Sequence, residues 1–488
     1  MTEPVRVRIA PSPTGFMHIA NIKSAMYDWL LARHTGGSFI LRIEDTDLTR
    51  KVEGAIDVIY ESLKWMGLDW DEGPDIGGPY GPYVQSERLS LYHEAADRLI
   101  AQGDAYYCYC SSERLEQVRK EQMANKQPPG YDRHCRNLTP EQRAEYKAQG
   151  IKPVIRMKIP LEGHVTFSDL IYGDVTFDYS TITDFVMLKS DGYPTYHLAN
   201  VVDDTAMKIT HIIRGDEWIS SVPMHLAIYK ALGYTPPLYV HHPMLLGPNR
   251  AKLSKRHGDV AVLQYREKGY LPEALFNFLA LIGWSLDDKT EIMTRQELID
   301  NFSLERISKT GALFNWEKLE WMNGLYIRNL SLDDFMERSI PYLENGLPET
   351  VERPLDKDYL KRMLELVQER AKTLAEVPEL VKFFYIEESG YEPDLLIGKK
   401  MTKEDAVKVL EVSLERLTTL EPFDIDSMEN LLRPLAEELG LKAGQLFGTL
   451  RVATTGRTAA PPLFQTMEVL GKEVCLDRME TALKKLKS

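Results

Sequence analysis

Two motifs that lie far apart in the chain carry residue types suited to binding phosphate. In the first, a loop with two prolines and Gly15 leads straight into a helical pattern whose first turn holds His18. A helix N-terminus offers free N–H groups and about half a positive charge, and a histidine can donate a hydrogen bond to a phosphate oxygen. In the second, Lys252 and Lys255 stand three apart in a loop after Gly247, where both could grip a nucleotide triphosphate. Taken alone, each motif is more often a turn or an exposed basic loop.

Three of the four cysteines form a cluster of a kind that binds metal. Cys108 and Cys110 flank a single residue, and Cys135 follows in the same part of the chain. Four cysteines in 488 residues are too few for a disulfide framework, and in a reducing compartment such a cluster indicates metal before a disulfide. Three thiolates in this register fit zinc, which takes four ligands in a closed structural site.

The first phosphate motif lies in a strand, helix, strand pattern. Residues 5–9 alternate apolar and charged side chains, apolar residues recur at helical spacing from His18 to Arg33, and residues 39–43 resemble a buried strand. This order opens a parallel α/β sheet, and such sheets bind ligands at the carboxyl ends of their strands. Residues 11–18 and 44–47 both fall at that end.

Farther along the chain the pattern changes twice. After a helix that runs to Ala101, the cysteine cluster and a basic, Pro-rich stretch look like an insertion, and strand-like alternation returns at residues 209–214 and 239–242. From about Ser331 onward the pattern is almost wholly helical. Two pairs resemble helix-start caps, Thr402 with Asp405 and Asp426 with Glu429. An apolar stripe that ends at Gly440 is formed by Leu431, Leu432, Leu435 and Leu439.

Composition excludes several classes of protein. With 43% hydrophobic and 27% charged residues the chain should fold throughout, and its length exceeds what one core usually serves. No apolar run is long enough for a membrane span and the N-terminus lacks a secretory pattern, so we expect a cytoplasmic protein. The net charge of -14 argues mildly against a nucleic-acid partner, but two local basic stretches, residues 114–136 and 250–257, remain candidates for one.

Taken together, in this order and with an α/β frame between them, the two phosphate motifs resemble the signatures of the class I aminoacyl-tRNA synthetases. Residues 15–21 match the first signature, although Ala20 and Asn21 depart from its glycine and histidine, and residues 252–256 match the second. Within the class, four stretches look like the bacterial glutamyl-tRNA synthetases: residues 8–15, 41–47, 188–204 and 213–218. The resemblance covers essentially the whole chain.

The resemblance implies an α/β fold, with a Rossmann-type parallel-sheet catalytic domain, an inserted domain that binds the acceptor end of tRNA, and all-α domains at the C-terminus. The implied boundaries are 1–90 and 198–258 for the two catalytic halves, 91–197 for the insertion, 259–330 for a stem-contact helical domain, and 331–388 and 389–488 for two anticodon-binding domains.

It also implies the reaction. The enzyme would use ATP with Mg²⁺ to turn L-glutamate into glutamyl-adenylate, and would then pass glutamate to the 3′ end of tRNA(Glu), releasing pyrophosphate and AMP. Members of this branch typically need the tRNA before they activate glutamate, and charging of tRNA(Gln) as well stays open. A monomer is expected, and Arg370 is aligned with an anticodon contact of the family.

Individual residues receive roles through the same resemblance. Arg8 and Arg214 would converge on a glutamate pocket, because a guanidinium offers a carboxylate two parallel hydrogen bonds. Glu44 would hold the α-ammonium group, and the other expected glutamate contacts are Ser12, Tyr196 and Asn200. The residues expected to stabilise the developing phosphate charge are His18, Lys252 and Lys255. The expected ATP contacts are Pro11, Thr14, Gly15, His18, Lys252, Ser254 and Lys255.

The fourth zinc ligand is the least determined residue of the expected sites. Some members of the family use a histidine two residues beyond the last cysteine, and here that position is Asn137. Tyr131 and His134 are the alternatives beside Cys108, Cys110 and Cys135, and a site already lost is the other interpretation.

Three rival functions fit the sequence less well. A tRNA-modifying glutamyl transferase would resemble only the catalytic half, and a nucleotidylyltransferase would lack the glutamate pocket. A catalytically silent tRNA-binding protein would have no need of intact His18, Lys252, Lys255, Arg8 and Arg214.

Overall fold

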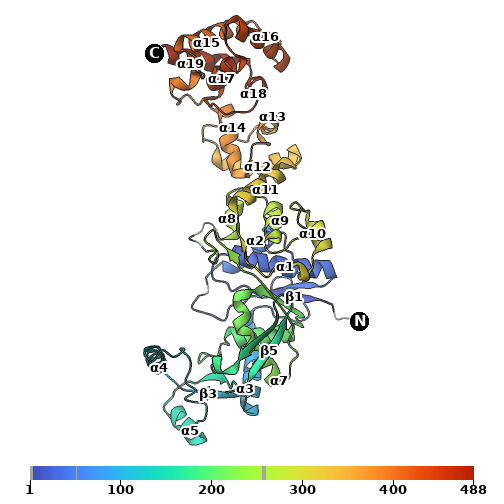
Figure 1. Cartoon of the computed structure of the whole chain (residues 1–488), viewed down its shortest axis with the longest axis vertical. Helices are drawn as coiled ribbons and strands as arrows, with labels where there is room; N and C mark the ends of the chain where they lie inside the picture. The colour runs from blue at the N-terminus through green and yellow to red at the C-terminus, as the bar shows by residue number, and fades with distance from the viewer. Residues whose placement is uncertain (1–3, 51, 255, 257–259) are drawn as a thin grey trace. The chain divides into compact units, whose positions relative to one another are not determined.

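The computed structural model describes residues 4–50, 52–254, 256 and 260–488, which fold as two units. The sheet unit comprises Met1–Tyr265 and Leu275–Asn315, and the helical unit comprises Arg266–Ala274 and Trp316–Ser488. All strands of the described residues lie in the sheet unit, and the helical unit is built from helices (Figure 1).

The expected strand, helix, strand pattern at the N-terminus is confirmed. Strand β1 (Arg6–Ile9) pairs in parallel with β2 (Ser38–Leu41), and Val7 lies opposite Phe39. Helix α1 (Ile19–Thr35) connects the two strands and buries residues along most of its length. It ends at Gly36, whose φ of 66° lets its N–H bond back to the carbonyl of Ala32.

Antiparallel elements interrupt the parallel ones after α2 (Ala55–Trp65) and α3 (Leu89–Gln102). A three-stranded antiparallel sheet has the order β3-β4-β7, with β3 at Ala105–Cys108, β4 at Val154–Met157 and β7 at Val186–Leu188. The helices α4 (Ser112–Ala124) and α5 (Pro140–Ala148) bury none of their residues. The hairpin of β5 (His164–Asp169) and β6 (Gly173–Asp178) joins a different sheet, because β5 also pairs in parallel with β9 (Leu238–His242) in the order β6-β5-β9-β8, with β8 at His211–Gly215.

The parallel pattern then resumes, as the sequence indicated. Helix α6 (Tyr196–Ala206) precedes β8 (His211–Gly215), which pairs in parallel with β9 (Leu238–His242) across α7 (Val222–Leu232). The backbone N–H of Thr210 donates to the carbonyl of Arg6, so β8 begins beside β1. The remaining elements around this unit are β10 (Leu245–Leu246), parallel to β11 (Ala312–Leu313), with α8 (Val262–Glu267), α9 (Pro272–Leu281) and α10 (Arg295–Asn301).

The helical unit confirms the expected all-α C-terminal part. Its helices share one continuous apolar core, and their bounds are α11 Trp316–Arg328, α12 Leu332–Gly346, α13 Lys357–Val367, α14 Val377–Tyr385, α15 Lys403–Thr418, α16 Ile425–Glu438, α17 Ala443–Thr455, α18 Leu463–Leu470 and α19 Lys472–Lys487. In the part of the chain that the structure describes, no helix is both long and apolar enough to cross a bilayer.

One of the two expected helix caps is confirmed and the other is wrong by two residues. Thr402 and Asp405 form a reciprocal capping box at the start of α15. Helix α16 is capped by Asp424, whose side chain accepts from the N–H of Ser427, and not by Asp426. Asp426 lies in the first turn instead, where its carboxylate interacts favourably with the helix dipole.

Candidate active site

The carboxyl ends of the parallel strands border one pocket of about 830 Å³. Residues at or just past the ends of β1, β2, β8 and β9 contribute to its wall, at the edge where the sequence placed a ligand site. The pocket brings together Arg8, Pro11, Ser12, Thr14, Glu44, Tyr196, Asn200, Arg214 and Lys252.

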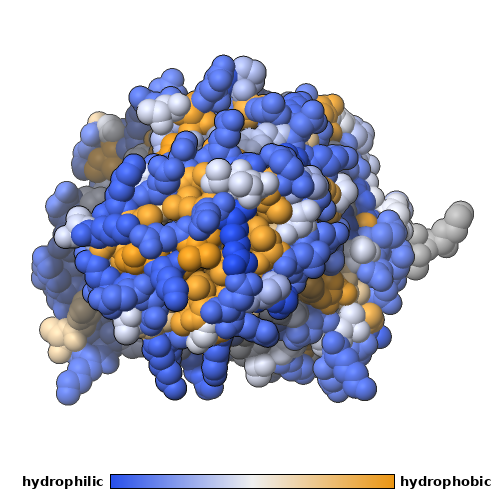
Figure 2. Space-filling view, turned by 90° about the horizontal axis from the view of Figure 1, so that it is seen from above, coloured by the Kyte–Doolittle hydropathy of each residue, from blue (hydrophilic) through white to orange (hydrophobic). Residues whose placement is uncertain are grey.

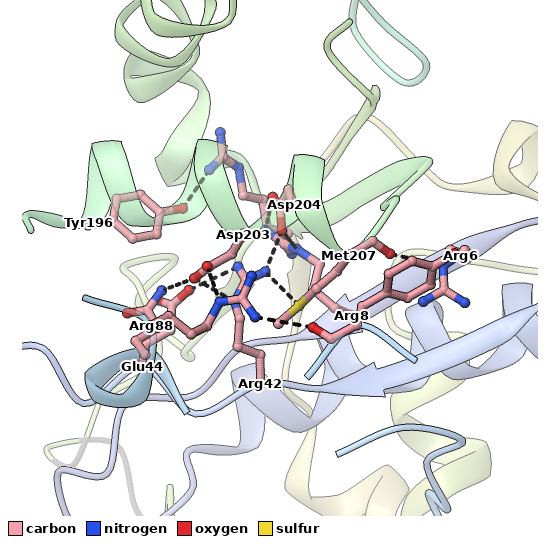
Figure 3. A network of polar contacts seen from close by, with 12 residues as sticks. Arg6, Arg8, Arg42, Glu44, Arg88, Tyr196, Asp203, Asp204 and Met207 are labelled. Atoms are coloured by element: carbon pink, nitrogen blue, oxygen red, sulfur yellow. Dashed lines mark hydrogen bonds and ion pairs between the residues drawn. The ribbon is translucent and has the colours of Figure 1, made fainter. Parts of the chain in front are cut away.

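Arg8 reaches the pocket with its charge already matched. Its side chain is buried, and its Nε and Nη2 donate to the two carboxylate oxygens of Asp204 at 3.0 and 3.2 Å (Figure 3). With its amide turned to satisfy both neighbours, Asn200 donates to Asp204 at 3.2 Å and accepts from Arg8 Nη2 at 3.0 Å. Among the described residues nothing accepts a hydrogen bond from Arg8 Nη1, which leaves that group for a ligand.

Arg42 ties this pair to the expected ammonium ligand. Its Nη1 donates to Asp204 at 2.6 Å and its Nη2 donates to Glu44 at 3.2 Å (Figure 3). Burial raises the pKa of Glu44 above its ordinary value, against the lowering effect of Arg42 and Arg8. Burial would also raise the pKa of Asp204, but its ion pairs and hydrogen bonds with Arg8 and Arg42 bring that pKa below the ordinary value.

A second buried carboxylate stands next to Asp204 on α6. Asp203 accepts from Arg88 Nε at 2.6 Å, from the Tyr92 hydroxyl at 2.9 Å and from Gln85 Nε2 at 2.9 Å. It also lies 3.7 Å from Arg42 Nε. Each buried carboxylate of α6 therefore binds at least one arginine, and the two carboxylates together orient the side chains of Arg8 and Arg42.

Arg214, at the end of β8, is held by a different set of partners. Its Nη1 donates to the Tyr196 hydroxyl at 2.7 Å, its Nη2 to the carbonyl of Trp218 at 3.3 Å, and its Nε to His241 Nε2 at 3.0 Å. All three acceptors are uncharged. Arg214 has no ion pair with any described residue, so its positive charge remains for a ligand in the pocket.

The phosphate loop is built differently from the expectation. His18 is the N-cap of α1, and its Nδ1 accepts from the N–H of Ala20 at 3.0 Å. The N–H groups of the first turn are all bonded within the protein, because Ile19 donates to Val260 at 2.7 Å and Asn21 and Ile22 donate to the carbonyl of His18. The expected free N–H groups are therefore wrong for this helix, although its dipole still points at the loop.

Gly15 and the lysine loop complete that side of the pocket. The φ of Gly15 is 118°, a conformation that L side chains rarely adopt, and apart from its chain neighbours no atom of the described residues lies within 4 Å of where its Cβ would be. The ammonium group of Lys252 pairs with Glu217 at 2.8 Å. Gly15, His18 and Ser254 are not among the lining residues, and Lys255 lies outside the described residues.

The three clustered cysteines lie together at the end of β3. The sulfurs of Cys110 and Cys135 are 3.6 Å apart, and the Tyr131 hydroxyl lies 3.3 Å from Cys108 Sγ and 3.8 Å from Cys110 Sγ. Four donors at zinc-ligand distance around one centre would be separated by about this much. His134 is exposed and does not belong to the group.

Around this cluster, the expected basic stretch is largely paired. Arg133 and Arg136 both bind the buried carboxylate of Asp184, Arg114 binds Asp132, and Lys120 binds Glu116. The guanidinium of Arg156 lies 3.8 Å above the ring of Tyr131. Much of the positive charge in residues 114–136 therefore stabilises the insertion itself.

Several residues of the site have no role in the sequence interpretation. Arg42, Asp203 and Asp204 hold the pocket, and His241 and Asp169 lie behind Arg214. One signal was present for Arg42, because it lies between Leu41 and Ile43 in an apolar strand, as Arg8 lies between Val7 and Ile9. Two adjacent aspartates on a helix carry no such signal.

The comparisons with known proteins agree over the whole chain. Residues 4–321 match the family model described as tRNA synthetases class I (E and Q), catalytic domain, and residues 334–483 match the one described as anticodon binding domain. A curated glutamate–tRNA ligase of Dehalococcoides mccartyi is 58% identical over 486 residues, which cover 100% of this chain and 99% of the relative. One of Moorella thermoacetica is 46% identical, covering 98% of both chains.

Solved structures agree as well. The crystal structure of a glutamate tRNA ligase from Elizabethkingia meningosepticum, in complex with its amino acid, superposes with a TM-score of 0.89. It is 35% identical in sequence and the match covers 99% of this chain and 100% of that one. The glutamate-tRNA synthetase from Elizabethkingia anophelis gives a TM-score of 0.87 at 34% identity.

Proposed function

This chain belongs to the glutamate–tRNA ligases, the class I tRNA synthetases that join glutamate to tRNA with the cleavage of ATP to AMP and pyrophosphate, and we propose that glutamate, ATP and the 3′ end of the tRNA bind together in the pocket at the ends of β1 and β8. The observation that carries the proposal is that Arg8 and Arg214 border the same pocket from two strands. One guanidinium is neutralised by Asp204 and the other is not, which suits a substrate with two carboxylates and one ammonium group.

The glutamate contacts follow from the charges that the pocket leaves unmatched. Arg214, with Tyr196 beside it, is the anchor for one carboxylate, and Arg8 Nη1 with Asn200 offers neighbouring donors. Glu44 receives the α-ammonium group, because a buried carboxylate whose pKa is raised gains most from a new positive partner. Ser12 completes the expected set at the mouth of the pocket.

The ATP side of the pocket supports activation by positioning and charge. The α-carboxylate of glutamate attacks the α-phosphorus, and pyrophosphate leaves. Mg²⁺ bound with ATP would neutralise part of the phosphate charge. Because Nδ1 of His18 accepts from Ala20, its ring proton is at Nε2 in the neutral form, the arrangement that can donate to a phosphate oxygen. The remaining expected ATP contacts are Pro11, Thr14, Gly15, Lys252, Ser254 and Lys255.

Lys252 has a defined alternative partner before ATP arrives. Its ammonium group rests on Glu217, and both side chains are partly exposed, so the pair costs little to open. A triphosphate in the pocket would replace Glu217 as the partner of the Lys252 ammonium group. The terminal 2′-hydroxyl of tRNA then attacks the carbonyl carbon of the adenylate, and AMP leaves.

Pyrophosphate exchange in the presence of tRNA tests this assignment. Lys252→Ala should lower the exchange rate by about 10²-fold, the effect of losing one group that stabilises transition-state charge, while glutamate binding by calorimetry stays unchanged. Lys230→Ala, an exposed lysine on α7 outside the pocket, is the matched control. Equal exchange by both variants would remove Lys252 from the ATP site.

Zinc is the second part of the proposal. Cys108, Cys110, Cys135 and Tyr131 supply four donors at mutual distances that suit one tetrahedral ion, which would tie the end of β3 to the loop before α5. The N–H of Tyr109 at 3.4 Å from Cys135 Sγ and Arg114 Nη1 at 3.6 Å from Cys110 Sγ would favour thiolates there. Protein purified without chelator should hold close to one zinc per chain, and Cys135→Ser should hold none. Full zinc content in Cys135→Ser would rule out this ligand set.

The nucleic-acid partner is the third part. We assign tRNA(Glu) to this chain, with tRNA(Gln) as a second acceptor to be tested, a cytoplasmic monomer as the working form, and the helical unit as the reader of the anticodon through residues that include Arg370. Hydrophobic side chains gather in the middle of the face of this unit seen in Figure 2, and such a surface suits contact with unstacked bases. Charging of separate transcripts of the two tRNAs with labelled glutamate decides between one acceptor and two.

The finer division into six segments, with boundaries at residues 90, 197, 258, 330 and 388, also stands as a proposal. Limited proteolysis should cut near residues 330 and 388, which lie between helices, before it cuts near residues 90 and 197, which lie in the first turns of α3 and α6, because exposed linkers are cleaved before packed elements. Cuts confined to other positions would redraw the domains.

A further inference from the structure

Behind Arg214 lies a buried pair of residues that does not itself line the pocket. His241 on β9 and Asp169 at the end of β5 are both buried, and His241 Nδ1 lies 2.6 Å from Asp169 Oδ2. The other ring nitrogen, Nε2, lies 3.0 Å from Arg214 Nε. The three side chains therefore form a line from the interior of the sheet unit to the pocket wall.

The direction of the hydrogen bonds in this line is fixed by chemistry. An arginine Nε always carries a hydrogen, so His241 Nε2 must be the acceptor and must be unprotonated. The ring proton then resides on Nδ1 and is donated to Asp169. His241 is consequently a neutral ring in a single tautomer.

Both carboxylate oxygens of Asp169 accept hydrogen bonds, and neither donates one. Its Oδ1 accepts from the backbone N–H groups of Ile171 and Tyr172, both at 2.9 Å. Its Oδ2 accepts from both the backbone N–H and the ring of His241, at 3.1 and 2.6 Å. Burial would raise the pKa of Asp169, but its hydrogen bonds with His241, Tyr172 and Ile171 bring that pKa below the ordinary value. The carboxylate thus stays ionised.

We propose that Asp169 and His241 are positioning residues for glutamate: Asp169 sets the tautomer of His241, whose Nε2 lone pair then aims Arg214 into the pocket without cancelling its charge. The proposal rests on Arg214 being a glutamate ligand. It explains why the acceptor behind Arg214 is a histidine, since a carboxylate in that place would compete with the substrate for the guanidinium. Arg8, which is paired with Asp204, shows the opposite solution within the same pocket.

A charge left open in this way should also distinguish glutamate from its uncharged amide. A desolvated cation gains far more from a carboxylate than from an amide oxygen, whereas a neutralised ion pair gains little from either. The selectivity of the pocket should therefore depend on the two residues behind Arg214 as well as on Arg214 itself.

Acid should switch this arrangement off. A protonated His241 would point an Nε2–H at the Nε–H of Arg214, and two donors repel each other. Burial lowers the pKa of His241, against the raising effect of the hydrogen bond to Asp169, so the ring is neutral at pH 7. The charged or titratable groups near the ring are Asp169, Arg214, Asp216, Tyr239, His225 and His242.

Three variants of His241 and Asp169 test the proposal by steady-state kinetics of aminoacylation. His241→Leu removes the acceptor, and Asp169→Asn must turn a donor toward either the backbone N–H groups or the ring. Both should raise the KM for glutamate about 10- to 100-fold, as removal of an orienting partner does elsewhere, while the KM for ATP changes little. His241→Gln can accept from Arg214 and donate to Asp169, so it should recover part of the loss.

The pH profile separates positioning from a loss of packing. Because burial lowers the pKa of His241, the KM for glutamate in the wild type should begin to rise only below the ordinary histidine value. In His241→Gln the rise should be smaller, because only the part caused by protonation of Glu44 remains. Equal KM values for His241→Gln and His241→Leu, or an unchanged acid rise in His241→Gln, would overturn the proposal. Arg214→Leu is the reference: if it leaves the KM unchanged, the glutamate assignment itself fails, whereas a large effect there with none at His241 rejects only the positioning role.

Discussion

The two units of the chain bury different kinds of side chain. In the sheet unit the buried residues include Arg8, Arg42 and Arg88 with Asp203 and Asp204. In the helical unit Arg478 is the one ionisable polar side chain among its described residues that is buried to the same degree, and it donates to the carbonyls of Thr454 and Ile386. The rest of that unit's core is hydrocarbon with a few hydroxyl and amide groups.

That contrast separates residues kept for stability from residues kept for a task. A buried ion pair can often be replaced by packed apolar side chains without loss of stability, so stability alone does not explain a charged network. In the sheet unit the network ends at the pocket, whose wall includes Arg8 and Glu44. In the helical unit charged side chains form ion pairs at the surface, as Arg416 and Glu438 do.

Removing the shared carboxylate of the network should give the largest effect. Asp204→Ala leaves Arg8 and Arg42 buried without their partner, so the unfolding free energy of the sheet unit should fall by about 3–5 kcal/mol. Glutamate binding should be lost in the same variant. Hydrogen-exchange mass spectrometry can follow each unit separately, and the helical unit should keep its protection. An Asp204→Ala protein as stable as the wild type would mean that the network is not a closed ion-pair system.

A cavity in the helical core should come next. Leu410 on α15 is fully buried, and Leu410→Ala should destabilise the helical unit by about 2–5 kcal/mol through lost burial and an unfilled cavity. The KM for glutamate should not change, because no pocket residue is involved. Leu414→Ala, a partly buried position on the same helix, is the control and should cost less. A raised glutamate KM in Leu410→Ala would contradict the separation of tasks.

Mild acid should act on one unit only. All 11 histidines of the sequence lie in the sheet unit, and burial lowers the pKa of His197 to about 4 and also lowers that of His225 and His242. The unfolded chain binds protons at these groups near pH 6.5, so their contribution to stability is complete above that value and is lost as the pH falls toward 4. Hydrogen exchange at pH 7 and pH 5 should show the sheet unit opening first. Parallel loss in both units would argue against this cause.

Breaking a surface pair should give the smallest effect. Arg416→Ala removes the ion pair with Glu438 between α15 and α16, and exposed pairs contribute little because water and salt screen them. No measurable change in Tm or in charging rate is expected. A clear loss of stability would show that the helical unit, too, depends on its charges.

The fold was largely predictable from the sequence, and the site only in outline. Periodicity located β1, α1 and β2 within two or three residues, and the resemblance to class I synthetases is confirmed by the family models. The cap of α16 was misplaced because Asp424 and Asp426 both precede the same apolar stripe, and only geometry selects the one that reaches a backbone N–H.

The partners of the site arginines were not predictable for a related reason. Local patterns tell which residues are buried in a strand, but they do not tell which distant residue faces them. Arg8 and Asp204 are separated by 196 positions, and Glu44, which lies near them, is also distant from Asp204 in the chain. The same limit applies to His241 and Asp169, whose meaning depends on a hydrogen bond with Arg214.

The backbone bonds on either side of His18 couple the two phosphate motifs mechanically. Ile19 N–H donates to Val260 and Val262 N–H donates to Met17, and His18 forms a β-bridge with Ala261. His18 is therefore held from both sides by one short stretch that follows the lysine motif in the chain. A substitution that displaces Val260 should displace His18 as well, so a defect in one phosphate motif should be inherited by the other.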